Sequence, residues 1–317
     1  MTGGVEQPSV AGPVMASGQR PAGGGWRVVR AALRNRKATA GLVILLVIAF
    51  VAAFPGLLAH DNPQAPIYAQ DQGPSAHHLL GTTLVGQDVW AQVIYGTRLT
   101  LIITLVVGVV ATLISTIIGV TAAYVGGVGD RVLSLFTDVF LIIPTLPLLI
   151  VLASYLPPGP VTLIIVLCAT SWAFQARQLR SQGMSLRNRD FLAAARVRGE
   201  RRMYIIFVEI VPCMTSLIAA SLLGVAVYAV GFAAGLQYLG LANGSELTWG
   251  TILYQAQSNG ALEAGNAWWI LGPGIAVALL GAGFALLNYA FDEIGNPALR
   301  PVRKAPRPAQ RKQVPGA

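Results

Sequence analysis

The sequence predicts an all-α integral membrane protein with six transmembrane helices. Only 11% of its 317 residues are charged, whereas a soluble domain carries roughly 25%. Hydrophobic residues make up 54% of the chain, and the mean hydropathy is +0.62. Several uncharged runs reach the roughly 20 apolar residues that a helix needs to cross about 30 Å of hydrocarbon. We therefore expect membrane lipid to surround most of the folded chain.

The six spans are expected in apolar runs with few or no charges. They cover residues 40–59, 99–127, 133–155, 160–177, 212–236 and 266–290. The first is the earliest run of sufficient length, and the second lies in the uncharged stretch between Arg98 and Asp130. The fifth begins near Pro212, and the sixth precedes the polar end of the chain. Because the first run is long enough to remain as a span, no cleavable signal is expected.

Spans three and four come from one apolar stretch that is too long for a single crossing. This stretch, residues 139–176, is interrupted by the proline-rich segment 156–160. Proline cannot donate a backbone hydrogen bond, so the interruption predicts a tight turn between two spans. Within span three, Pro144 and Pro147 are expected to kink the helix.

The two ends of the chain are polar. Residues 1–25 are rich in Gly, Pro, Ser and Gln, and residues 298–317 are rich in Pro, Arg and Lys. Segments of such composition bury too little apolar surface to fold. We expect disordered basic tails at 1–36, where a short helix precedes the membrane, and at 298–317, with the six-span domain at 37–297 between them.

The basic residues favour one orientation in the membrane. Lysine and arginine concentrate in cytoplasmic loops. If the N-terminus is inside, all of the 22 basic residues except Arg98 face the cytoplasm. The outer loops then hold Asp61, Asp71, Asp88, Glu246 and Glu263. Both termini are therefore expected in the cytoplasm. The net charge of +9 reflects this topology, and no nucleic-acid partner is expected.

The cysteines and histidines indicate no metal site. Cys168 and Cys213 lie in or beside apolar runs without CxxC spacing, which excludes a disulfide framework or a zinc motif. We expect them to be packing residues. His60, His77 and His78 are close in sequence but have no matching pattern of carboxylates or cysteines, so they are interpreted as loop residues.

One cytoplasmic segment is unusually basic. Residues 191–202, FLAAARVRGERR, hold four arginines. The three consecutive alanines favour a helix, and Gly199 can adopt the positive φ that closes one. The pattern predicts a short helix, a sharp turn at Gly199 and a second helix that leads to Pro212. A short helix held outside the membrane between two spans is expected to dock in a groove on a soluble partner.

This segment resembles the EAA loop of ABC importer permeases, in which EAA is followed by three residues, a glycine and about a dozen residues before a closing Leu-Pro. The matching residues are Ala194, Ala195, Gly199 and Pro212. Ala193 replaces the usual glutamate, Glu200 a small residue and Glu209 a common histidine. The resemblance implies that this loop couples the permease to an ATPase. The coupling residues that it implies are Ala194, Ala195, Arg196, Gly199, Glu200 and Pro212.

A second segment narrows the resemblance to a subfamily. Residues 79–101, LLGTTLVGQDVWAQVIYGTRLTL, look like the segment ahead of span two in the C-type permeases of dipeptide, oligopeptide and nickel importers. The matching residues are Gly81, Thr82, Gly86, Asp88, Tyr95, Gly96 and Arg98. Thr83 and Gln87 stand where the family usually has an aspartate and an arginine.

A third segment matches the same subfamily at span three. Residues 130–150, DRVLSLFTDVFLIIPTLPLLI, are similar to the family pattern through Arg131, Asp138 and Pro144. Asp138 is the only acidic residue within a predicted span, and it is expected to pair with Arg131, on the same helical face, or with backbone. The resemblance covers residues 34–297 and implies the type I ABC importer permease architecture, with a cytoplasmic coupling helix between spans four and five.

The resemblance also implies a function and a set of partners. The chain is expected to be a permease subunit for di- or oligopeptides in a bacterial inner or plasma membrane. Its expected partners are a second, B-type permease, two ATPase subunits and an extracytoplasmic solute-binding protein. The chain has no GxxxxGKS or GxxxxGKT motif to hold a nucleotide phosphate. ATP and Mg²⁺ are therefore expected on the partner ATPases, with no catalytic residue, metal or cofactor in this chain.

Three alternatives stay open on the sequence. Nickel or another small solute is carried by the same subfamily. An ion-coupled secondary transporter would show internal repeats and polar groups at the membrane midplane. A membrane enzyme would need clustered catalytic side chains, for which His60, His77 and His78 beside Asp61 and Asp71 are the only candidates.

The sequence does not identify substrate-binding residues. The near absence of charge in the spans favours a wide and weakly selective path. Residues of the last outer loop are expected to contact the binding protein, namely Trp249, Tyr254, Gln255, Gln257 and Asn259. Trp268 and Trp269 are expected to mark the membrane interface.

Overall fold

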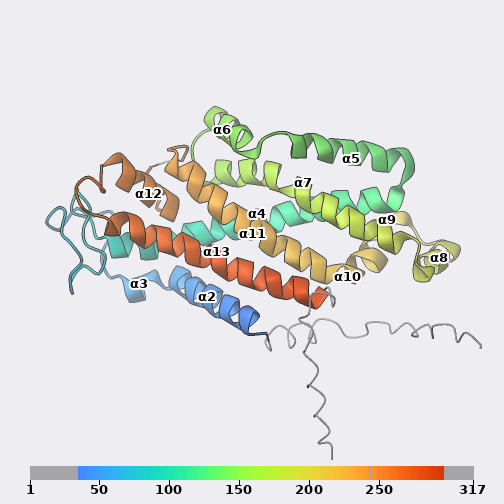
Figure 1. Ribbon diagram of the computed structural model, residues 1–317, viewed down its shortest axis with the longest axis horizontal. Coiled ribbons are helices and arrows are strands. Elements are labelled where there is room, and N and C mark those ends of the chain that lie inside the picture. The colour runs from blue at the N-terminus through green and yellow to red at the C-terminus, as the bar shows by residue number, and fades with distance from the viewer. Residues whose placement is uncertain (1–34, 243, 296–317) are drawn as a thin grey trace, which may run out of the picture.

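The computed structural model describes residues 35–242 and 244–295, and these form a bundle of long helices (Figure 1). The expected tails at 1–36 and 298–317 lie outside the described residues, apart from Asn35 and Arg36. The described residues contain no strand, only an isolated bridge between Thr82 and Asp88. The predicted all-α membrane architecture is confirmed.

Within the part of the chain that the structure describes, five helices are long and apolar enough to cross a membrane. They are α2 (Arg36–Ala53), α4 (Val89–Val125), α7 (Pro160–Arg187), α11 (Thr215–Tyr238) and α13 (Trp268–Gly295). The remaining expected span, span three, is a bent pair, α5 (Gly127–Ile142) and α6 (Thr145–Tyr155), whose axes meet at 88°. Shorter helices join these elements: α3 (Pro55–Leu58), α8 (Asp190–Val197), α9 (Arg202–Tyr204), the π-helix η1 (Ile205–Ile210), α10 (Val211–Cys213) and α12 (Trp249–Ser258).

The bend in span three lies at Pro144, as predicted. Ile143 has an extended backbone, with φ −69° and ψ 126°, because proline disfavours the helical conformation in the residue before it. Pro144 then caps α6. Pro147 lies in the first turn of α6, where a backbone N–H has no helical partner to lose. The prediction that Pro147 also kinks the helix is therefore wrong.

Helix α4 begins earlier than the predicted second span, at Val89 instead of residue 99. Its start is determined by Asp88, whose carboxylate accepts a hydrogen bond from the Ala91 backbone N–H at 2.8 Å. Its 37 residues make a helix about 56 Å long, which is longer than a bilayer core is thick. Arg98, expected in the outer loop ahead of the span, consequently lies within the helix.

The core of the bundle is formed where α4, α7 and α11 meet. Buried apolar side chains of all three helices pack together there, among them Val107, Leu167 and Ala229. The α4 and α7 backbones approach closely because Gly119 has no side chain. A Cβ at Gly119 would lie 2.4 Å from the Ala176 carbonyl oxygen. Helices α2 and α13 pack in the same way through glycines on both helices.

Candidate functional site

The predicted docking helix is present as α8, at one end of the bundle beyond the end of α7 (Figure 1). It ends as the sequence predicts. Gly199 has a φ of +77° and donates its N–H to the Arg196 carbonyl at 3.0 Å, while the Glu200 N–H bonds the Ala195 carbonyl at 3.2 Å. These two bonds are the Schellman motif, which stops the helix and reverses the chain.

Helix α8 has a buried face and an exposed face. Leu192 and Ala195 are fully buried against a cluster of apolar side chains from α4, α7 and η1. Ala194 and Val197 lie on the opposite side and are exposed, Val197 to 89%. The two motif alanines therefore have different surroundings: Ala195 packs within the chain, and Ala194 belongs to a free surface.

Arg196 contacts this chain's own helices. Its guanidinium lies 5.6 Å from the ring centroid of Tyr124 at the end of α4. It also donates a hydrogen bond to the Arg187 carbonyl at the end of α7, at 3.1 Å. Arg196 thus attaches α8 to the ends of two long helices, so that a displacement of α8 acts directly on both.

Arg198 joins the two acidic residues at which this loop departs from the family pattern. Its guanidinium lies 3.6 Å from the Glu200 carboxylate and 3.3 Å from the Glu209 carboxylate. The arginine side chain is 54% exposed, and exposed ion pairs contribute only about 0.2–1 kcal/mol each. We call these three residues the Arg198 clasp. The clasp connects the end of α8 with η1.

Replacing Arg198 by glutamine is expected to loosen α8 locally without unfolding the bundle. Hydrogen exchange in residues 198–204 should become faster by up to about thirtyfold, because the substitution removes two exposed ion pairs that contribute at most about 1 kcal/mol each. Mass spectrometry of the purified chain would measure this, with Arg189→Gln as the control. An equal acceleration in the control, or none in the Arg198 variant, would contradict the role of the clasp.

Pro212 accounts for the π-helix that follows α8. Proline cannot donate to the carbonyl four residues back, and its ring clashes with that carbonyl. The helix widens instead, and the Val211 N–H bonds the Ile206 carbonyl, five residues earlier. Such π segments occur frequently at functional sites. The predicted second helix before Pro212 is thus present, with an altered hydrogen-bond register that the sequence did not reveal.

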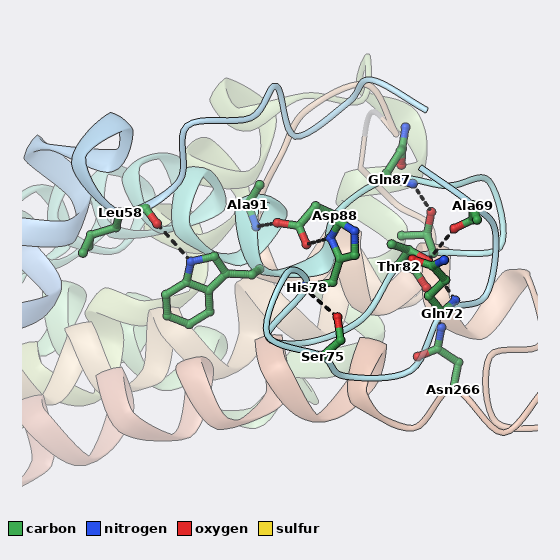
Figure 2. Close-up of polar contacts among 12 residues, drawn as sticks. Leu58, Ala69, Gln72, Ser75, His78, Thr82, Gln87, Asp88, Ala91 and Asn266 are labelled. Atoms are coloured by element: carbon green, nitrogen blue, oxygen red, sulfur yellow. Dashed lines mark hydrogen bonds and ion pairs between the residues drawn. The ribbon is translucent and has the colours of Figure 1, made fainter. Parts of the chain in front are cut away.

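The motif before span two lies at the end of the molecule opposite α8 (Figure 1), and its polar contacts are drawn in Figure 2. Gly81 and Gly86 have positive φ, and a Cβ on either would lie within 2.3 Å of a backbone carbonyl oxygen. The Thr82 hydroxyl donates to the Ala69 carbonyl at 2.8 Å, and the Thr82 carbonyl accepts from Asn266 at 2.7 Å. These residues therefore fold the segment 59–88 onto α4 and the start of α13.

The rest of this motif continues along α4. Gly96 lets the ring of Trp249 and the side chain of Ile252 approach α4 closely. Tyr95 donates its hydroxyl to the Ala59 carbonyl at 3.4 Å. Arg98 is exposed and forms no ion pair with any described residue.

His78 lies in a loop, as interpreted, but it pairs with a carboxylate that the sequence did not match to it. Its Nδ1 atom lies 3.3 Å from the Asp88 carboxylate, and both side chains are buried (Figure 2). The pKa of Tyr68, whose ring packs edge-on against His78, is raised, chiefly by a hydrogen bond to the Asp61 carboxylate. Although Asp88 belongs to the recognised motif, its pairing with His78 depends on how the loop folds back, which residue spacing does not specify.

The predicted pairing of Asp138 with Arg131 is also wrong. Asp138 pairs with Arg177 of α7, and Arg131 is exposed. Nearby, Arg180 makes two bonds to the Asp130 carboxylate, at 2.5 and 2.7 Å. The reason is tertiary, because α5 packs along the arginine-bearing part of α7. Both pairs adjoin a cavity of about 110 Å³ between α4, α5 and α7.

Three expectations about single residues are wrong, because the side chains are more or less buried than the sequence predicted. Trp249 is buried, and its indole N–H donates to the Val93 carbonyl at 2.9 Å, so it is not available to a binding protein. Trp269 is buried in the bundle, while Trp268 is exposed. Cys168 is buried as expected, but Cys213 is exposed.

The comparisons with known proteins agree with this geometry. Residues 115–301 match the family of binding-protein-dependent transport system inner membrane components, and residues 25–78 match the N-terminal transmembrane domain of oligopeptide transport permease C. The predicted family, and with it the type I permease fold, is confirmed.

Three relatives illustrate the similarity. The chain is 30% identical to a putative peptide transport system permease protein of Brucella abortus, covering 86% of this chain and 91% of the relative. It is 31% identical to the oligopeptide transport system permease protein OppC of Mycobacterium tuberculosis, over 88% and 97%. It is 28% identical to the dipeptide transport system permease protein DppC of Haemophilus influenzae, over 84% and 92%. The chain therefore belongs to the family of binding-protein-dependent transport system inner membrane components, and it is a membrane transport subunit.

Proposed function

We propose that this chain is the C-type permease subunit of an ATP-driven importer of di- or oligopeptides. It forms half of the translocation path together with a second, B-type permease. Two separate ATPase subunits bind ATP and Mg²⁺, and an extracytoplasmic binding protein delivers the solute. The supporting relatives are named as peptide, oligopeptide and dipeptide permeases. The proposed location is the bacterial plasma membrane, with both termini in the cytoplasm.

The observation that carries the proposal is the construction of α8. A helix of eight residues stands outside the spanning bundle and presents an exposed side that includes Ala194 and Val197. Its other side is attached to the ends of α4 and α7 through Leu192, Ala195 and Arg196. A soluble ATPase that moves α8 would therefore move two spans with it.

The energy source acts through a difference in affinity. A ligand shifts a conformational equilibrium only by as much as its affinities for the two states differ. ATP must therefore bind more tightly to one arrangement of the two ATPases than to the other. In each arrangement the ATPases hold α8 in a different position. The segment that transmits this movement begins at Gly199 and ends at Pro212. Glu200 belongs to the Arg198 clasp, which connects α8 with this segment.

Changing the exposed side of α8 is expected to release the ATPases while leaving the permease pair intact. Val197→Asp places a charge on a fully accessible position of α8, so the chain itself should fold normally. Val128→Asp is the matched control, because Val128 is also an exposed valine, 74% accessible, at the start of α5. Tagged chains would be purified from their own membranes in mild detergent, and the co-purified proteins identified by mass spectrometry.

The two variants should separate clearly. We expect ATPases with the native chain and with Val128→Asp, at least tenfold less with Val197→Asp, and the second permease with all three. ATP-dependent uptake of dialanine, compared with uptake of Ni²⁺, would identify the solute class. Failure of the native chain to retain any ATPase, or full retention by Val197→Asp, would contradict the proposal.

A further inference from the structure

A cavity of about 320 Å³ lies at the end of the bundle opposite α8. It is open on one side and is lined by the segment that precedes α4, the first turn of α4, the segment between α11 and α12, and α12 itself. The lining residues are Gln64, Gln87, Gln92, Gly244, Ser245, Glu246, Leu247 and Gln255. Its volume is within the range of about 300–1,000 Å³ that is usual for small-molecule sites. Glutamines and one glutamate dominate its wall, and no basic side chain of residues 35–242 or 244–295 lines it.

The four glutamine side chains donate their amide N–H groups to the protein. The bonds are Gln64 to the Ser245 carbonyl at 3.1 Å, Gln87 to the Gln64 carbonyl at 2.9 Å, Gln92 to the Pro63 carbonyl at 3.3 Å and to the Gln87 side-chain oxygen at 2.8 Å, and Gln255 to the Gly244 carbonyl at 3.2 Å. A backbone carbonyl can only accept a hydrogen bond. These bonds therefore fix which end of each amide is nitrogen and which is oxygen.

Acceptors without donors are left at the cavity. The amide oxygens of Gln64, Gln92 and Gln255 accept no hydrogen bond from any described residue. The Gln92 oxygen is buried and therefore closed off from the cavity, which leaves the oxygens of Gln64 and Gln255 as the available amide acceptors. The Glu246 carboxylate adds a negative charge that no described residue neutralises through an ion pair.

This wall is complementary to a cationic donor. A primary ammonium group carries three N–H donors and no acceptor, and charge-assisted hydrogen bonds are the strong ones. A bare metal ion fits less well, because hard cations need oxygen ligands that converge to about 2.3–2.6 Å. The cavity is roughly ten times the 30 Å³ that a water molecule occupies in the liquid. Its size matches an organic residue that carries an ammonium group.

We infer that this cavity binds the ammonium group of a peptide at the outer mouth of the transport path. Glu246 supplies the counter-charge, and the amide oxygens of Gln64 and Gln255 supply the acceptors. The inference rests on the proposed function, and it assigns a peptide-binding subsite to a chain whose sequence indicated none. Gln255, expected from its position to contact the binding protein, is assigned here to the solute.

Equilibrium binding to the full chain in lipid nanodiscs tests the assignment. The probes are L-alanyl-L-alanine and its N-acetyl derivative, which lacks the ammonium group, observed by saturation-transfer NMR. Glu246→Gln keeps the side-chain shape and removes the charge. Glu263→Gln is the control, because Glu263 is an exposed carboxylate of the same end of the molecule that does not line the cavity. We expect the Kd of dialanine to rise about tenfold in Glu246→Gln and to stay unchanged in Glu263→Gln.

The N-acetyl peptide should bind the native chain at least tenfold more weakly than dialanine does. Equal binding of the two peptides, or an unchanged Kd in Glu246→Gln, overturns the assignment of the cavity. ATP-driven dialanine uptake by the native complex is measured in parallel. If the native complex takes up dialanine but Glu246→Gln leaves the Kd of dialanine unchanged, the inference is overturned and the proposed function stands. If the native complex takes up no peptide, the proposed function is overturned.

Discussion

Replacing Gly119 by alanine is expected to separate α4 from α7 and to destabilise the bundle. The added Cβ would lie 2.4 Å from the Ala176 carbonyl oxygen and 3.1 Å from the Leu179 Cβ. Neither is the end of a flexible side chain, so the helices themselves must move apart. Overpacking of this kind costs about 1–3 kcal/mol. The effect should be large because α4 and α7 form the most extensive helix pair of the bundle.

The same substitution at Gly231 is a matched control. Gly231 lies within α11 and has open space around its Cα, so alanine there should raise helix stability by about 0.5–1 kcal/mol. Thermal unfolding in detergent can be followed by labelling of the buried Cys168 thiol in a Cys213→Ser background. Equal unfolding midpoints for the two alanine variants would contradict the close approach of α4 and α7.

Replacing Gly199 by valine is expected to uncouple the permease from its ATPases. The position has a φ of +77°, and no atom lies within 4 Å of the point that a Cβ would occupy, so the penalty is conformational and not steric crowding. A left-handed backbone costs an ordinary residue about 1–2 kcal/mol, and the Schellman turn that orients α8 should be lost. We expect ATP-dependent uptake by the assembled complex to fall about tenfold or more.

Gly199→Asn distinguishes conformation from contact. Asparagine tolerates the left-handed region, so this variant should retain most of the uptake and most of the bound ATPase. The unfolding temperature should fall only slightly in either variant, because no atom lies within 4 Å of the point that a Cβ at position 199 would occupy. An equal loss in both would show that the partner requires a glycine for contact at this position and would contradict the conformational argument.

Much of the architecture was predictable because it rests on local features. The scarcity of charge and the length of each apolar run identify the spans, and proline identifies the bend at Pro144. The end of α8 was predictable in the same way, since its capping bonds join residues within five positions of one another. The boundaries were less accurate where a helix leaves the membrane. Helices α4 and α7 both extend beyond the apolar run that identified them.

The pairing of polar groups was not predictable. Asp138 pairs with Arg177, 39 positions later in the chain, and the nearer Arg131 is left exposed. His78 pairs with Asp88 only because the outer loop folds back on itself. Residue type and spacing specify neither pair, because each depends on which helices or loop segments lie side by side.

By itself the sequence determined the class of the protein, its long helices and the position of α8, because composition, apolar run length and helix-capping residues act over a few residues. Only the tertiary structure decided which charges pair, which tryptophans are buried, and how α8 is attached to α4 and α7. It also decided that four glutamines and Glu246 from separate segments line one cavity. Such contacts depend on packing, in which a missing side chain at Gly119 matters as much as any side chain that is present.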